Sequence, residues 1–242
     1  MRYLSTIKKV GLLNFLRTIK IELRKKTFVT KERLLNKTSD KNSFSQYAED
    51  LYIDRILNYK KNGVYIDIGA NHPSILNNTK RFYDRGWNGI NIEPDTINYS
   101  KFLDERPRDI NLNIGISNNP GDFVFFIFKE DSLSTFSEKN AQKLVSNGYK
   151  ITEKKIVKTF KLSKIIADNN LVEIDFMSID AEGYDQEVLN SNDWSKFRPR
   201  LICIEDSTGH SFNYFFKKIS YKKLCYNGTN SFYIDKLKNE KN

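Results

Sequence analysis

The chain has 242 residues, 39% of them hydrophobic and 29% charged, which suits a folded α/β protein and excludes a disordered one. No run approaches the roughly eighteen apolar residues of a membrane span, and we expect a cytoplasmic protein in which Cys203 and Cys225 are reduced core thiols. The net charge of +10 is concentrated in residues 1–41, which hold twelve Lys or Arg against three Asp or Glu. The remainder is nearly neutral, which argues against a broad nucleic-acid-binding face.

The sequence predicts an amphipathic helix over residues 5–25, because apolar residues recur at steps of three and four. They are Ile7, Val10, Leu13, Leu16, Ile19 and Leu23. Two interpretations stay open: the helix packs on its own domain or a second subunit, or it lies on the inner face of a membrane through residues 1–41. Residues 36–43 are polar and predict a linker. We therefore expect a basic amphipathic helical segment with a linker over 1–43 and the main domain over 44–242.

From residue 44 onward the sequence alternates between helix and strand patterns. Helices are expected at 44–57, 75–86, 101–106 and 137–147, and strands at 64–68, 89–93, 110–116, 122–128, 174–180 and 200–205. Residues 155–170 pass from strand to helix, and 221–235 predict a terminal hairpin that turns near Asn227-Gly228. Apolar strands alternating with helices predict a mostly parallel sheet with an antiparallel edge. In such sheets ligands bind at the carboxyl ends of the strands.

The first two strand ends carry a candidate nucleoside site. Strand 64–68 leads into Asp67-Ile68-Gly69-Ala70-Asn71, and strand 89–93 ends in Glu93. A glycine turn followed after about 20 residues by an acid is typical of units in which the acid binds ribose hydroxyls. The acid before the glycine disfavours a pyrophosphate and favours a cation, which argues against a dinucleotide-dependent dehydrogenase. S-adenosylmethionine, with a ribose, a sulfonium and no phosphate, fits better. The alternative is that Asp67 caps a turn and Glu93 is a surface acid.

Several segments in this order resemble the FkbM family of S-adenosylmethionine-dependent methyltransferases, over roughly residues 44–206. They are FSQYAED, GVYIDIGANHP, NNTKRFYDRGWNGINIEPD, RPRDINLNIGIS, SLSTFS and DFMSIDAEGYDQEVL. The resemblance implies a Rossmann-like class I methyltransferase fold and methyl transfer to oxygen, often on sugars. One departure is Met177 and Ser178 before Asp180, where many members carry a lysine.

The resemblance also assigns cofactor residues by position. It implies that Asp67, Gly69, Ala70 and Asn71 line the methionine part, with Asp180 close by. Glu93 would hold the ribose and Asn113 would lie near the adenine. Gln46 and Asp50 would close over the cofactor or the acceptor.

Four further acids follow the later strands: Asp180, Glu182, Glu205 and Asp206. Four carboxylates around one cleft repel each other unless they are protonated or bind a cation, and oxygen ligands favour Mg²⁺ or Mn²⁺. Similarity to metal-dependent sugar O-methyltransferases implies that Asp180, Glu205 and Asp206 bind the metal and that Glu182 is the general base. The alternatives are that Glu182 only begins a helix and that the other pair caps a loop.

The histidines leave the identity of the base open. His210 lies in a loop after strand 200–205 and His72 follows the cofactor turn, so either could replace Glu182 as base.

We predict an S-adenosylmethionine-dependent O-methyltransferase for a sugar hydroxyl on a nucleotide sugar or a surface-polysaccharide precursor. We also predict a homo-oligomer that binds no nucleic acid. The alternative is a membrane-surface or scaffold component of a glycan-assembly complex with a degenerate cofactor site.

Overall fold

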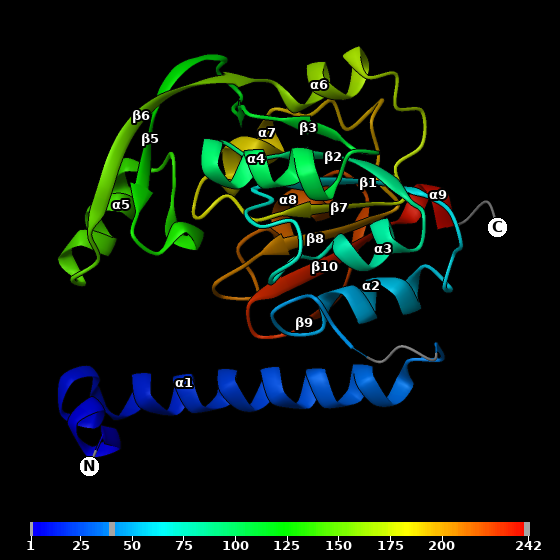
Figure 1. Ribbon diagram of the computed structural model, residues 1–242. Helices are drawn as coiled ribbons and strands as arrows, with labels where there is room; N and C mark the ends of the chain where they lie inside the picture. The colour runs from blue at the N-terminus through cyan, green and yellow to red at the C-terminus, as the bar shows by residue number, and fades with distance from the viewer. Residues whose placement is uncertain (1, 39–41, 240–242) are drawn as a thin grey trace.

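The computed structural model describes residues 2–38 and 42–239 (Figure 1). Residues 39–41 of the expected linker lie outside this part. The main feature of the fold is a seven-stranded sheet of order β3-β2-β1-β7-β8-β10-β9. The strands are β1 (Val64–Ile68), β2 (Asn88–Ile92), β3 (Ile110–Leu112), β7 (Phe176–Ile179), β8 (Leu201–Glu205), β9 (Tyr221–Tyr226) and β10 (Asn230–Asp235).

Strands β3, β2, β1, β7 and β8 are parallel, whereas β10 pairs antiparallel with both β8 and β9. The strand order reverses between β1 and β7, as in doubly wound Rossmann-like sheets. The predicted fold class and the C-terminal hairpin are therefore confirmed. The position of β10 between β8 and β9 was not foreseen.

Helices cover both faces of the sheet because strand side chains alternate between them. Ile66 and Ile68 of β1 pack in a core with residues of α6, α7 and α8, while Tyr65 packs in a second core with residues of α2 and α3. The helices are α1 (Arg2–Leu35), α2 (Glu49–Ile56), α3 (Lys80–Asp84), α4 (Thr96–Glu105), α5 (Glu138–Ser146), α6 (Leu162–Asp168), α7 (Asp185–Asn190), α8 (Asn213–Lys218) and α9 (Lys236–Asn239), with a 3-10 turn η1 (Asp131–Leu133). None of the described helices is both long and apolar enough to cross a bilayer.

Two expected elements are shorter than predicted because amide side chains bond to the backbone. The helix expected at 75–86 begins only at α3, since Asn77 Oδ1 accepts from the backbone N–H groups of Thr79 (2.9 Å) and Lys80 (2.8 Å). The strand expected at 110–116 is split after β3. Asn113 at the break donates to the carbonyl oxygens of Glu93 (2.8 Å) and Pro94 (2.9 Å).

The chain between β3 and β7 forms a second, three-stranded sheet of order β4-β6-β5, built from β4 (Gly115–Ile116), β5 (Gly121–Phe128) and β6 (Ile151–Phe160). Strands β5 and β6 are antiparallel and are joined through η1 and α5. This pair, here called the arm (residues 121–160), projects from the main sheet in Figure 1. The sequence predicted its strand 122–128 and its helix 137–147 but not its position.

Helix α1 is longer than the predicted 5–25 and lies along the body beside α2 and β9 (Figure 1). Phe28 of α1 stacks on Phe232 with ring centroids 6.0 Å apart. Glu32, 1% exposed, accepts two hydrogen bonds from Arg55 at 2.8 and 2.9 Å. Helix α1 is therefore docked on the main domain through its C-terminal half.

Candidate functional site

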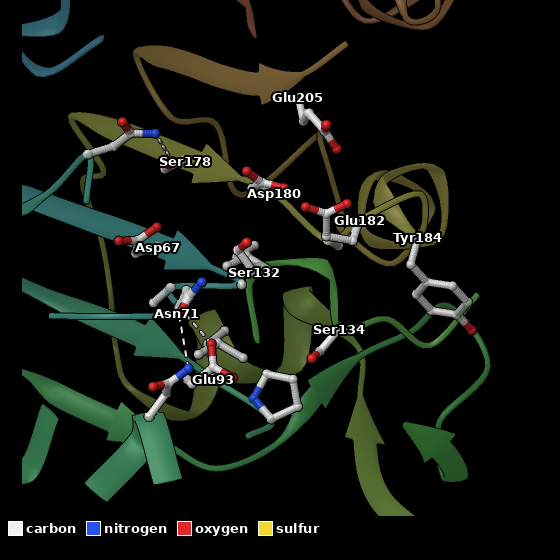
Figure 2. A pocket seen from close by; sticks show the side chains of 18 of the residues that line it. Asp67, Asn71, Glu93, Ser132, Ser134, Ser178, Asp180, Glu182, Tyr184 and Glu205 are labelled. Carbon is white, nitrogen blue, oxygen red and sulfur yellow. Dashed lines mark hydrogen bonds between the residues drawn. The ribbon is translucent and has the colours of Figure 1, made fainter. Parts of the chain in front are cut away.

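A cavity of about 390 Å³ opens at the carboxyl ends of β1, β2, β7 and β8, where the strand order reverses. The walls of the cavity come from segments far apart in the sequence: 67–71 at the end of β1, 92–94 at the end of β2, 180–182 after β7, and 131–134 of the arm. Figure 2 shows Asn71 and Glu93 together on one side, and Asp180, Glu182 and Glu205 grouped on the other. The predicted ligand position at the strand ends agrees with this cavity.

Gly69 lets the two sides of the cavity approach each other. It has φ +73°, a conformation that favours glycine, and a Cβ atom there would lie 1.8 Å from the carbonyl oxygen of Asp180. The turn after β1 therefore packs directly on the backbone at the end of β7. Any other residue at position 69 would have to push these two segments apart.

Glu93 is held firmly at the end of β2. Its carboxylate accepts backbone N–H groups from Asn71 and from Asp95, both at 2.7 Å, and its side chain is nearly buried. Asn71 itself has φ 51°, which asparagine tolerates better than most residues. Burial raises the pKa of Glu93 to about 8, although the two N–H groups oppose this shift. The acid is thus pre-positioned at the cavity wall.

A network of buried polar side chains holds the Asp67 carboxylate in place. Its carboxylate accepts from Thr79 Oγ1 at 2.9 Å and from Asn77 Nδ2 at 3.2 Å, and Arg106 Nη2 donates to Asn77 Oδ1 at 3.0 Å. Arg106 is fully buried. Burial raises the pKa of Asp67 to about 6 against these hydrogen bonds and the Arg106 charge. The sequence did not assign Arg106 or Asn77 to the site.

Asp180, Glu182 and Glu205 form an acidic cluster, with one carboxylate oxygen of each within 4.8 Å of the others. The Asp180 carboxylate lies deep in the molecule yet is reached by solvent through the cavity. Burial, reinforced by the neighbouring acids, raises the pKa of Asp180 and raises those of Glu182 and Glu205 to about 8. Such a cluster favours either bound protons or a cation.

The arm holds the backbone of Glu182. Its carbonyl oxygen accepts from Asn140 Nδ2 at 2.7 Å and from Thr135 Oγ1 at 2.8 Å. Glu182 has φ 50°, an unfavourable conformation for a residue with a long side chain. Hydrogen bonds from the arm therefore maintain the turn that carries the Glu182 carboxylate into the cavity.

Asp206 does not join this cluster, although the sequence grouped it with Asp180 and Glu205 as a metal ligand. It is 1% exposed, and its carboxylate accepts from Ser231 Oγ at 2.7 Å and Gly209 N at 2.9 Å. Burial alone would raise the pKa of Asp206, but hydrogen bonds from Ser231, Ser211 and Thr208 hold it below its usual value. Asp206 organises the loop after β8, and the third carboxylate of the cluster is that of Glu182.

The other cofactor residues inferred from the resemblance divide into two groups. Gln46 and Ala70 line the cavity. Asp50 and Asn113 do not. Asp50 is buried at the beginning of α2, where it accepts from Ser43 Oγ at 2.6 Å and Phe44 N at 3.0 Å, and Asn113 bonds to the carbonyls after β2. Both hold loops around the cavity rather than face into it.

Neither histidine lines the cavity. His210 is exposed, and its Nδ1 lies 3.2 Å from Asn213 Nδ2. His72 Nδ1 accepts the N–H of Ser74 at 3.1 Å. The geometry therefore favours Glu182 over either histidine as the group that meets an acceptor.

The arm and α1 add lining residues that sequence reasoning did not assign. Ser132, Leu133, Ser134 and Phe136 come from the arm, and Lys25 and Tyr47 come from α1 and the loop before α2. Of these residues, only those at 132–136 lie in a segment, SLSTFS, that the family resemblance had singled out. Asn98 Nδ2 bridges the two parts by donating to Asn71 Oδ1 (2.9 Å) and Asp131 Oδ2 (3.1 Å).

A family model described as the methyltransferase FkbM domain matches residues 67–228. Among solved structures, an FkbM methyltransferase from Methylobacillus flagellatus KT is similar at 14% identity and TM-score 0.44, over 72% of this chain and 44% of that chain. A putative caffeoyl-CoA O-methyltransferase from Staphylococcus aureus gives 11%, TM-score 0.39, and 90% and 98% coverage. The small RNA methyltransferase HEN1 gives 9%, TM-score 0.39, and 83% and 28%.

The chain thus spans less than half the length of the first of these structures. No curated protein matches the sequence.

Proposed function

The chain belongs to the methyltransferase FkbM domain family, and we propose that it is an S-adenosylmethionine-dependent O-methyltransferase that acts on a sugar hydroxyl. One observation carries this proposal. A single cavity is lined by Asp67 and Glu93, each held by hydrogen bonds from other residues, and by the open acidic cluster of Asp180, Glu182 and Glu205. The first set suits a cofactor and the second suits the activation of an acceptor.

The side with Asp67 and Glu93 matches the polarity of S-adenosylmethionine. When bound, this cofactor supplies an electrophilic methyl group on a positively charged sulfonium. Each Glu93 oxygen that accepts one N–H group keeps a lone pair for a ribose hydroxyl. Asp67 and Asp180 add negative charge near the turn at Gly69, where a cationic amino-acid end would be favoured.

Glu182 is the proposed general base. A sugar hydroxyl is a poor nucleophile near neutral pH, and a positioned carboxylate that removes its proton raises the rate. Because burial and the neighbouring acids raise the pKa of Glu182 to about 8, its carboxylate, once deprotonated, is a stronger base than that of an ordinary glutamate. The hydrogen bonds from Thr135 and Asn140 fix its backbone, so the arm contributes to this geometry.

A divalent cation fits the acidic cluster by its chemistry. Three carboxylates within 4.8 Å of each other supply the oxygen ligands that Mg²⁺ and Mn²⁺ prefer. We propose that Asp180 and Glu205 hold such an ion, with Glu182 at its edge. A bound divalent ion would lower the pKa of a coordinated hydroxyl.

Titration calorimetry with S-adenosylhomocysteine tests the cofactor assignment. We expect binding by the wild type, and loss of binding in Asp67→Ala while the exposed control Glu153→Gln binds normally. A screen of nucleotide sugars with S-adenosylmethionine then tests methyl transfer. A folded protein that binds no S-adenosylhomocysteine would contradict the proposal and favour the scaffold alternative.

The metal is tested separately by Mn²⁺ binding in electron paramagnetic resonance. We expect the EDTA-treated protein to bind Mn²⁺ and Glu205→Gln to bind it more weakly. Methyl transfer that is indifferent to EDTA, together with unchanged Mn²⁺ binding in Glu205→Gln, would remove the metal and leave the rest of the proposal intact.

A further inference from the structure

Helix α1 has an inner face that the main domain occupies. Phe28 contacts Tyr52 with ring centroids 5.3 Å apart, and Glu32 is paired with Arg55. Lys25 donates to Tyr47 Oη at 3.2 Å. With 3.6 residues per turn, positions 25, 28 and 32 lie on one side of the helix. The opposite side is therefore turned away from the domain.

That opposite side carries apolar residues. Leu16 is 52% exposed, Ile19 38%, Leu23 60% and Leu34 75%, and their spacing places them along one stripe. In the part of the chain that the structure describes, no element packs over this stripe. The predicted amphipathic pattern is thus real for these positions, but it does not serve docking on the chain's own domain.

Two threonines continue the stripe between Leu23 and Leu34. Thr27 Oγ1 donates to the carbonyl oxygen of Leu23 at 2.8 Å, and Thr30 Oγ1 donates to that of Lys26 at 3.0 Å. Because these hydroxyls are satisfied within the helix, burying them against an apolar phase costs less than burying free hydroxyls.

Cationic residues border the stripe on both edges. At 3.6 residues per turn, Lys20 and Lys31 fall along one edge, and Lys26 and Arg33 along the other. Over residues 14–35 the only acid besides the buried Glu32 is Glu22, which lies 3.0 Å from Lys25. An apolar stripe with positive borders complements an anionic lipid surface. A second copy of the helix would instead bring like charges together.

We propose that the outer face of α1, defined as Leu16, Ile19, Leu23, Thr27, Thr30 and Leu34, lies on the surface of an anionic bilayer. The helix would lie in the plane of the interface, and the cations at its edges would face lipid head groups. Lys25 and Tyr47 on the inner side also line the cavity. The bilayer would therefore lie about one helix diameter, roughly 10–12 Å, from that wall of the cavity.

Vesicle co-sedimentation of the full chain tests this inference without reference to enzymatic activity. We expect binding to vesicles of equal parts phosphatidylglycerol and phosphatidylcholine, little binding to phosphatidylcholine alone, and weakening with added salt. The triple variant Lys20→Glu, Lys26→Glu, Lys31→Glu should lose on the order of 100-fold in partitioning. The matched control Lys139→Glu, Lys143→Glu, Lys217→Glu makes the same charge change at exposed positions elsewhere and should bind like the wild type.

The apolar part has its own variant, Leu16→Ser with Leu23→Ser, which removes exposed side chains and should leave folding unchanged. Val172→Ser, at a residue 92% exposed in the loop before β7, is its control. Equal binding to both vesicle types, or unchanged binding in both α1 variants, would overturn the proposal. So would a dimer in analytical ultracentrifugation that the Leu16 and Leu23 changes dissociate, because the outer face would then be an interface between two copies.

Discussion

The two sides of the cavity hold their acids in different ways. On the side proposed for the cofactor, Glu93 and Asp67 each accept at least two hydrogen bonds from fixed donors. On the side proposed for the acceptor, no donor among the described residues reaches the carboxylates of Glu182 or Glu205, and these acids lie close to each other and to Asp180. The acids of the first side are therefore already held by hydrogen bonds within the chain. The carboxylates of Glu182 and Glu205 receive no such bonds from the described residues.

This difference indicates how each side should respond to change. A completed hydrogen-bonded wall provides shape and fixed polarity, so its loss should appear in binding affinity. Unpaired carboxylates at raised pKa provide a proton acceptor or cation ligands, so their loss should appear in turnover, metal affinity and pH dependence. Changes on one side should therefore alter only one of these sets of properties, and a change where the two sides touch should alter both.

The largest loss of binding and stability is expected from Gly69→Ala. Gly69 lies where the two sides of the cavity touch. The new Cβ would lie 1.8 Å from the Asp180 carbonyl oxygen, and backbone cannot yield as a flexible side chain would. We expect loss of S-adenosylhomocysteine binding and a fall of at least about 2 kcal/mol in the free energy of unfolding, measured by calorimetry and urea unfolding. Gly121→Ala is the control, because its nearest contact is 3.7 Å. Normal affinity in Gly69→Ala would contradict the close approach of the turn after β1 to the Asp180 backbone.

Glu182→Gln should act on the acceptor side alone. It removes the proposed base without changing the backbone, so turnover should fall by about 10²–10⁴ while S-adenosylhomocysteine affinity stays unchanged. The assay is methyl transfer to the acceptor found in the screen, with calorimetry in parallel. Full activity in this variant would leave the role of base to another group.

Glu93→Ala should act on the cofactor side. Loss of charged hydrogen bonds to a ribose should reduce S-adenosylhomocysteine affinity by roughly 10- to 100-fold, and Mn²⁺ binding at the acidic cluster should persist. Calorimetry measures the first quantity and electron paramagnetic resonance the second. Glu130→Ala, at an exposed acid of the arm, should change neither. Loss of Mn²⁺ binding in Glu93→Ala would mean that the two sides are not separable.

The smallest effect concerns stability against pH. The pKa values of Glu182 and Glu205 are raised from 4.5 to about 8, so the folded protein binds protons that the unfolded chain releases. Their contribution to the free energy of unfolding is complete below pH about 4.5 and is lost as the pH rises through about 8.

We therefore expect the melting temperature in EDTA to fall between pH about 5 and 8, and the fall to be smaller by about 2–4 °C in Glu182→Gln. Mn²⁺ should restore the wild type at the upper pH. An identical slope in both proteins would show that this cluster does not carry raised pKa values.

Much of the fold follows from local patterns. The short apolar runs at 64–68 and 200–205 and the hairpin signal around Asn227-Gly228 predicted these elements, because such runs between turn residues are typical of strands that are buried on both faces. Asp67 and Glu93 could be identified because strand order and acid spacing place them at one sheet edge. The shortened helix at α3 was missed because the Asn77 side chain competes with helical hydrogen bonds, which periodicity does not report.

The sequence by itself determined the α/β class, the family, the acids at the strand ends and the amphipathic pattern of residues 5–25. Only the tertiary structure decided that Asp206 turns into its own loop while Glu182 joins the cluster, since that depends on donors from Ser231 and Gly209. It also decided that the arm reaches over to hold Glu182, and that α1 docks through Phe28 and leaves Leu16 and Leu23 exposed. These outcomes depend on contacts between segments far apart in the chain, and local spacing carries no information about which of two acids, or which of two helix faces, meets its partner.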